Sequence, residues 1–169
     1  MEIQSVDSFV KHYENIRERT MRVVRCTPPD KIEWTCREGG FTIGDLMRHL
    51  AAVERYVFAE SVQGNPSRYP GCGRDLAEGL ESVLGFMERL HRESIAIFSH
   101  LTDEDLNRKG VTPDGHPIAA WKLLRAMVEH EIHHRGQIYV YLGILGVATP
   151  PLYTLREHEL RALSVPAPA

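Results

Sequence analysis

Three histidines within five residues are the strongest chemical signal in the sequence: His130, His133 and His134. Residues four apart on a helix lie about 5–6 Å apart at Cβ, so the imidazoles of His130 and His134 can bind one metal ion. His133 lies about 100° around the helix from His134, and we expect it on the flank. Two buried histidines without a ligand would each need a hydrogen-bond partner or cost about 1–3 kcal/mol. The spacing therefore predicts half of a metal site.

A long helix must carry this pair, because apolar residues recur around it at helical spacing. A helix over about residues 118–145 places both histidines in its core-facing stripe. The apolar members of that stripe are Leu123, Met127, Ile138, Tyr141 and Leu145. Glu131 lies about 60° from His134, where we expect a carboxylate that is solvated or supports a ligand from behind.

Three further amphipathic helices are predicted by the same periodicity. The first covers about residues 6–25, and the third, the most regular, covers residues 76–101. The second begins at a capping box formed by Thr42 and Asp45, and its stripe consists of Ile43, Leu46, Leu50, Val53 and Val57. His49 lies at the margin of this stripe. A short helix over 152–163 follows the fourth long helix, and no strand alternation is visible. The fold class is therefore all-α, with residues 1–169 forming one domain, an up-down four-helix bundle with a short additional C-terminal helix.

Composition excludes several classes of function. The formal net charge is −3 and the sequence pI is about 6.3, so no nucleic-acid partner is expected. The polar, acidic start and the lack of a run of about 20 apolar residues indicate a cytoplasmic protein that does not bind a membrane. Cys26, Cys36 and Cys72 are an odd set without CxxC spacing, and we expect free thiols.

One interpretation of the central stretch is the HExxH motif, which spans His130 to His134. In a zinc protease its histidines bind the metal and the glutamate is the general base, with Glu157 or Glu159 as a downstream ligand. The extended motif fails, because Gln137 replaces its glycine and Val140 its third histidine. The 35 residues after His134 also show no strand to align a peptide substrate.

The second interpretation is that the chain resembles the DinB-like family over nearly its whole length. The most specific part is His-x3-His-Arg-Gly-Gln, matched by His130 and His134 through Gln137. A second part is the helix opening over residues 41–50, which ends near His49 and continues into Glu54-Arg55-Tyr56. The resemblance implies that His49, His130 and His134 bind a divalent metal, zinc or nickel. It also implies an up-down bundle of unusual connectivity and a homodimer.

The chemistry of three neutral imidazoles is consistent with this implication, because it leaves an open position on the ion for water or substrate. Family relatives include thiol S-transferases and a thiol-dependent isomerase. We therefore expect a metal-dependent transferase that acts on a small molecule, with a low-molecular-weight thiol as partner. The alternatives are a metal-dependent hydrolase and a noncatalytic metal-binding stress-response protein.

The remaining signals are weaker. His91, His100, His116 and His158 have no partner at ligand spacing, and we expect exposed or capping roles for them. Gly136 and Gly143 each cost about 1 kcal/mol in a helix compared with Ala. They indicate a close helix contact or a partner chain at that level, which agrees with a homodimer.

Overall fold

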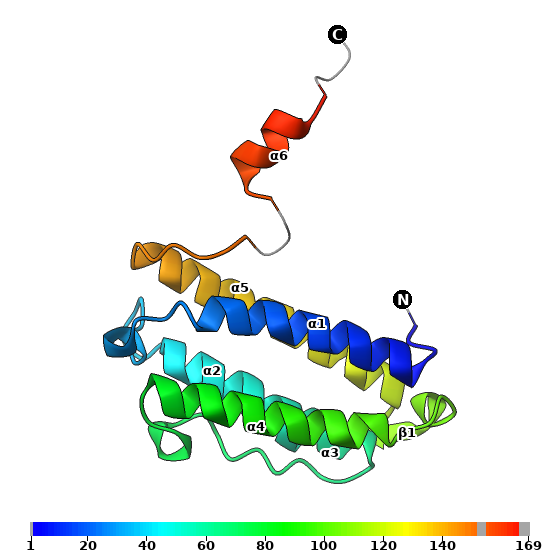
Figure 1. Cartoon of the computed structure of the whole chain (residues 1–169). Helices are drawn as coiled ribbons and strands as arrows, with labels where there is room; N and C mark the ends of the chain where they lie inside the picture. Colours follow the sequence, from blue (N-terminus) through cyan, green and yellow to red (C-terminus); the bar gives the residue numbers. More distant parts are fainter. Residues whose placement is uncertain (1, 152–154, 166–169) are drawn as a thin grey trace.

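The computed structural model describes residues 2–151 and 155–165, and four helical arms form a bundle within them (Figure 1). The arms are α1 (Val6–Val24), α2 (Ile43–Val53) with its continuation α3 (Ala59–Val62), α4 (Leu80–Ser99) and α5 (Ala120–Ile144). Short 3-10 turns, η1 (Pro29–Lys31), η3 (Arg74–Leu76) and η4 (Asp105–Asn107), lie in the connections. The predicted all-α four-helix bundle is confirmed.

The helix that carries His49 begins where its capping box predicts. The Thr42 hydroxyl accepts a hydrogen bond from the Asp45 backbone N–H at 2.9 Å, and the Asp45 carboxylate accepts one from the Thr42 N–H at 3.0 Å. Two N–H groups that the helix cannot satisfy internally thus find partners. The start of α2, and with it the position of His49, is set locally.

The third predicted helix began too early, at residue 76. Leu76 ends the turn η3, and α4 starts at Leu80 after Gly79, whose φ is 77°. A φ in this region is left-handed and suits glycine, so the chain cannot continue as one helix through Gly79. The apolar periodicity extends across the break because Leu76 still packs against the core.

The connectivity of the bundle includes one long crossover. Figure 1 shows α2 and α4 running in the same direction, joined by a segment that returns along the length of the bundle. We call residues 63–79 the return segment. Neighbouring helices of one direction cannot be joined by a tight turn, since the chain must first travel back to the end where α2 began.

A π-helical segment, η2 (Glu54–Phe58), interrupts the second arm directly after α2. Its hydrogen bonds skip one more residue than those of an α-helix, which changes the face that later residues present. The predicted stripe accordingly fails at Val57, which is half-buried, and continues through Ala59 and Val62. The same change leaves Glu54 only 2% exposed inside the bundle.

A small hairpin that the periodicity did not predict precedes α5. Strands β1 (Lys109–Val111) and β2 (Pro117–Ala119) pair antiparallel, with Lys109 opposite Ala119. Three residues are too short a stretch for a recognisable alternation. Gly110 is required at this position, because a Cβ there would collide with the Ser61 carbonyl oxygen of α3.

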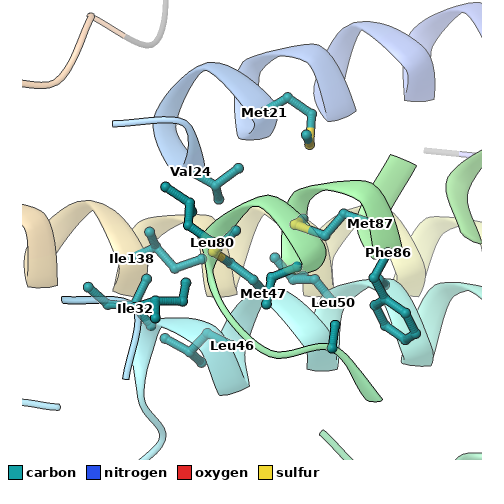
Figure 2. Packing of buried hydrophobic residues seen from close by; sticks show 14 of the residues in the cluster. Met21, Val24, Ile32, Leu46, Met47, Leu50, Leu80, Phe86, Met87 and Ile138 are labelled. Carbon is teal, nitrogen blue, oxygen red and sulfur yellow. The ribbon is translucent and has the colours of Figure 1, made fainter. Parts of the chain in front are cut away.

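The hydrophobic core has two parts. One joins the C-terminal half of α1 to α2 and the first half of α4, as Figure 2 shows for Met21, Met47, Leu50 and Met87. The other lies towards the hairpin and contains Phe9, Tyr13, Phe98 and Leu124. On α1 and α5 the residues between the two parts include buried charged side chains, so a polar layer crosses the bundle at mid-height.

The C-terminal helix α6 (Glu157–Leu163) is shorter than the predicted 152–163, and residues 152–154 lie outside the described part. All of its residues are exposed, and Figure 1 shows it apart from the bundle. Among the helices described, none is long and apolar enough to cross a membrane.

Candidate metal centre

The three predicted histidines meet between α2 and α5. One nitrogen from each of His49, His130 and His134 lies within 4.8 Å of the others. The shortest distance, 3.1 Å, joins Nε2 of His49 to Nε2 of His130, and the rings of His130 and His134 lie 4.4 Å apart at their centroids. The helical spacing of four residues brings the α5 pair together, whereas only the packing of α2 on α5 adds His49.

The separation of these nitrogens suits a metal ion. Two imidazole nitrogens bound to one zinc ion at about 2.0–2.1 Å with tetrahedral angles lie about 3.3 Å apart. The distance between His49 and His130 is 3.1 Å, which is close to that value. Within the described residues the cluster contains neither a cysteine nor a carboxylate. The donor set is therefore three neutral imidazoles, and a zinc or nickel ion accepts all three.

Hydrogen bonds orient two of the rings. Nδ1 of His134 lies 2.6 Å from Oε1 of Gln137, which can only accept, so Nδ1 carries the proton and Nε2 keeps its lone pair for a metal. Nδ1 of His49 lies 2.7 Å from the hydroxyl of Tyr69. Gln137 and Tyr69 thus each occupy the Nδ1 side of a histidine, and the Nε2 side remains for the cluster.

Burial keeps the cluster neutral. Burial and, after it, the neighbouring His134 and His49 together lower the pKa of His130 to about 3. Burial likewise lowers the pKa of His49 to about 4, with His134 contributing. For His134 burial also outweighs the hydrogen bond to Gln137, which would raise the pKa. Uncharged imidazole is the form that binds metal, so the ligands are ready at neutral pH.

The predicted orientation of α5 was partly wrong. His130 and His134 are half-buried at the edge of the core-facing stripe, whose centre holds Glu131 and Arg135 at 1% and 3% exposure. Because apolar residues usually mark the core, the sequence pattern placed the core-facing side of α5 too close to the histidines, although charged residues occupy its centre. The edge position directs the imidazoles to α2, where His49 lies.

A buried ionic cluster lies behind the histidines and forms the polar layer. The Arg17 guanidinium on α1 contacts the carboxylates of both Glu54 and Glu131, the latter at 3.0 Å, and lies 3.2 Å from the Tyr13 hydroxyl. Nδ1 of His91 on α4 lies 2.9 Å from Glu54. Glu131 is thus neither solvated nor bonded to a ligand, and His91 is not an exposed or capping residue. The prediction was wrong for both, because their partners are distant in the sequence.

This cluster is strongly charged. Burial alone would lower the pKa of Arg17, but attraction to Glu131 and Glu54 raises it. Burial alone would raise the pKa of Glu54, and Arg17 and His91 keep it below its ordinary value. Arg17 therefore joins α1 to the helices that carry the histidines, since Glu54 follows α2 and Glu131 neighbours His130.

The HExxH interpretation does not fit this geometry. A protease needs Glu131 as a base beside the metal, but its carboxylate pairs with Arg17 in the core. Glu157 and Glu159 lie on α6, apart from the bundle (Figure 1). The described residues around the histidines thus lack both carboxylates that the motif requires.

The other predicted residues lie away from the centre. His133 is exposed on the flank of α5, as expected, and the three cysteines are free thiols. His100, His116 and His158 are exposed, as predicted. A Cβ on Gly136 or Gly143 would meet nothing within 4 Å, so these glycines mark no close helix contact within residues 2–151 and 155–165.

Two hydrogen-bond partners of the ligands, Gln137 and Tyr69, were not predicted from the sequence. The contact of Gln137 could have been predicted, since Gln137 lies three residues after His134 on the same helix face. The contact of Tyr69 could not, because Tyr69 lies 20 residues from His49 in a segment without periodicity. Only the path of the return segment brings it to the site.

Comparison with known proteins agrees with this architecture. YjoA of Bacillus subtilis (strain 168), an uncharacterized protein, is 26% identical over an alignment of 154 residues that covers 89% of this chain and 97% of YjoA. Its crystal structure, described as DinB-like, superposes with a TM-score of 0.72 at 23% identity, covering 88% of this chain and 99% of that one.

Two further structures share the fold. YfiT of B. subtilis, a probable metal-dependent hydrolase with an unusual four-helix bundle topology, has a TM-score of 0.67 at 20% identity, over 85% of this chain and 89% of YfiT. A mycothiol-dependent maleylpyruvate isomerase has a TM-score of 0.63 at 11% identity, over 79% of this chain and 60% of the isomerase. The family model of the DinB superfamily matches residues 12–138, which include all three clustered histidines. On this match and the shared bundle, the chain belongs to the DinB superfamily.

Proposed function

We propose that this protein is a metal-dependent enzyme of small molecules, with His49, His130 and His134 as ligands of a zinc or nickel ion. The observation that carries the proposal is the convergence of three neutral imidazoles within 4.8 Å of one another. Three histidines leave at least one position free, which is the donor set of catalytic rather than structural zinc. An ion at such a site acts as a Lewis acid and favours the deprotonated form of a coordinated water or thiol.

The chain's own residues prepare the site for this chemistry. Gln137 holds the proton of His134 on Nδ1, and burial keeps His130 and His49 uncharged. Aromatic rings flank the histidines: Phe41 lies 5.6 Å from the ring of His49, and Phe58 lies 6.1 Å from that of His130. These rings lower the polarity around the ligands and favour a substrate with an apolar part.

The reaction that we propose is thiol S-transfer: the sulfur of a low-molecular-weight thiol would form a bond to a small electrophile, the thiol proton would pass to water, and the leaving group of the electrophile would depart. The fold is shared with a mycothiol-dependent isomerase, and the open three-histidine set suits a thiol as a further ligand. Hydrolysis is the second candidate, favoured by the shared fold with YfiT. In a hydrolase, water rather than a thiol would occupy the open position of the metal, and His49, His130 and His134 would still hold the ion.

Cobalt-substituted protein distinguishes these candidates. If a thiol binds the metal, adding a small thiol should produce a sulfur-to-cobalt charge-transfer band. The experiment uses a triple variant, Cys26→Ser, Cys36→Ser and Cys72→Ser, so that no thiol of the chain contributes. The control is the same protein with His49→Ala, which should lose both the metal and the band.

The possible results separate the classes of function. A band together with conjugation of small electrophiles supports the thiol transferase. Ester or amide hydrolysis without a band supports the hydrolase. Full metal occupancy with neither signal, up to millimolar concentrations of several physiological thiols, would overturn the enzymatic proposal and leave a noncatalytic metal-binding protein.

A further inference from the structure

The three candidate ligands differ in how their rings are held. His130 and His134 lie on one helix, and Gln137 of the same helix orients His134 at 2.6 Å. His49 is the single ligand on α2, and its Nδ1 lies 2.7 Å from the Tyr69 hydroxyl. Tyr69 belongs to the return segment rather than to a bundle helix. The orientation of the third ligand thus depends on a part of the chain outside the helices.

The return segment is fixed on both sides of Tyr69. Before it, the Arg68 N–H donates to the Tyr56 carbonyl at 2.9 Å, and the Arg68 side chain pairs with buried Glu60 at 2.5 Å. After it, Nε of Arg48 donates to the Cys72 carbonyl at 2.7 Å. These contacts limit the freedom of the segment, so the Tyr69 hydroxyl is presented to His49 at low entropic cost.

Arg48 connects this anchoring to His49 itself. It is fully buried beside His49 on α2, and its guanidinium is held by Glu33 at 2.9 Å and Asp45 at 2.8 Å. It also donates to the Ala77 carbonyl at 3.0 Å. One residue of α2 therefore anchors the return segment, and the next residue receives the hydroxyl that this segment carries.

The direction of the hydrogen bond between His49 and Tyr69 decides which nitrogen of His49 can bind metal. Burial, and after it the neighbouring thiol of Cys72, raise the pKa of the Tyr69 hydroxyl, so the hydroxyl keeps its proton and can donate it to the sulfur. If Tyr69 donates its proton to the Cys72 sulfur, its oxygen accepts from Nδ1–H of His49. Nε2 of His49 then keeps its lone pair towards His130, 3.1 Å away.

We infer that Tyr69 is a positioning residue for the metal centre: it holds His49 in the Nδ1–H tautomer and directs Nε2 to the ion. This inference rests on the proposed metal site and extends it to the return segment. Groups that hold a metal-binding histidine in this way typically change metal affinity by about 10–100-fold when they are removed.

The test compares Tyr69→Phe with Tyr139→Phe in the full chain. Each variant loses one tyrosine hydroxyl that makes a hydrogen bond, since Tyr139 donates to the Pro150 carbonyl at 3.0 Å. Tyr69 is 38% exposed, so the phenylalanine should not disturb folding. The zinc dissociation constant, measured by competition with a chelator, should rise about 10–100-fold in Tyr69→Phe and stay within about threefold of the original protein in Tyr139→Phe.

A second measurement does not depend on metal. Nitrogen-15 NMR of the histidine side chains in metal-free protein should show His49 as the Nδ1–H tautomer, and Tyr69→Phe should remove this bias. Cys72→Ser keeps an acceptor for Tyr69 and should preserve the tautomer. An unchanged tautomer in Tyr69→Phe, or unchanged zinc affinity, overturns the positioning role.

The two readouts also separate this inference from the proposed function. If the original protein binds neither zinc nor nickel, the proposed function fails. The tautomer of His49 then still decides whether Tyr69 orients it. If metal binds tightly and Tyr69→Phe changes neither readout, the proposed function stands and the role of Tyr69 is rejected.

Discussion

Nε2 of His49 on α2 lies 3.1 Å from Nε2 of His130 on α5, although 81 residues separate them in the chain. Hydrophobic burial does not explain why these two rings approach each other, since both are only half-buried at the edge of the core. Without a metal, one of these nitrogens can donate a hydrogen bond to the other, whereas a shared metal ion would take the lone pairs of both. The expected properties of the protein follow from this pair and from the charges behind it.

The ligand set can be tested by alanine variants. His49→Ala, His130→Ala and His134→Ala should each lower bound metal strongly, because two imidazoles hold a divalent ion far less well than three. His133→Ala is the matched control: its exposed side chain points away, and most of the metal should remain. Elemental analysis of the purified variants gives the answer. Full occupancy in His49→Ala together with loss in Glu157 or Glu159 variants would restore the protease interpretation.

The buried ionic cluster should dominate the stability of the bundle. Arg17→Met leaves the carboxylates of Glu54 and Glu131 buried without their cation, which typically costs about 3–5 kcal/mol. Arg25→Met is the control, since its pair with Glu88 is half-exposed and should be worth at most about 1 kcal/mol. Urea unfolding of both variants measures the difference. Equal losses would show that Arg17 does not compensate these carboxylates.

The lowered pKa values of His130 and His49 predict how the metal-free protein responds to acid. Above about pH 6.5 these histidines are neutral in both the folded and the unfolded chain and do not affect the free energy of unfolding. Below that pH the unfolded chain takes up protons, while the folded chain resists until about pH 3 at His130 and about pH 4 at His49. Stability should therefore fall between about pH 6.5 and pH 3, with the contribution of His49 complete near pH 4.

The contribution of His130 to this pH dependence can be isolated. His130→Asn removes one group with a lowered pKa, so the unfolding free energy should fall less steeply with acid than in the original metal-free protein. His133→Asn, at an exposed position, should leave the slope unchanged. Urea titrations at several pH values decide, and an identical slope for His130→Asn would contradict the buried, neutral state of that histidine.

A homodimer is expected from the outer face of α5. Ile132, Val140 and Ile144 are 44%, 60% and 60% exposed there, beside Gly136 and Gly143, which have open space around them. Burying such a stripe against a second copy removes apolar surface from water. Sedimentation at micromolar concentration should therefore give twice the 19.2 kDa mass of one chain.

A double variant tests whether this face forms the contact. Val140→Glu with Ile144→Glu should shift the protein to monomer, because the contact would bury two uncompensated charges. Val111→Glu, at a 37% exposed valine of β1, is the control and should leave the dimer intact. A 19.2 kDa species in the original protein would argue against the dimer.

The sequence by itself determined the four long helices and the pairing of His130 with His134. Apolar residues at steps of three and four predicted the four helices, and the capping box of Thr42 and Asp45 located the start of α2. The pairing of His130 with His134 also followed from spacing, since a helix brings every fourth residue together. These features are local, and local periodicity is sufficient to predict them.

Only the tertiary structure decided what surrounds the pair. The approach of His49 and Tyr69, and the burial of Glu131 against Arg17, join residues from different parts of the chain, and no spacing rule predicts such contacts. The buried charges also violate the rule that apolar residues mark the core, which is why the face of α5 was misassigned. Whether a buried glutamate is tolerated depends on a cation from another helix, and that cation is placed by packing.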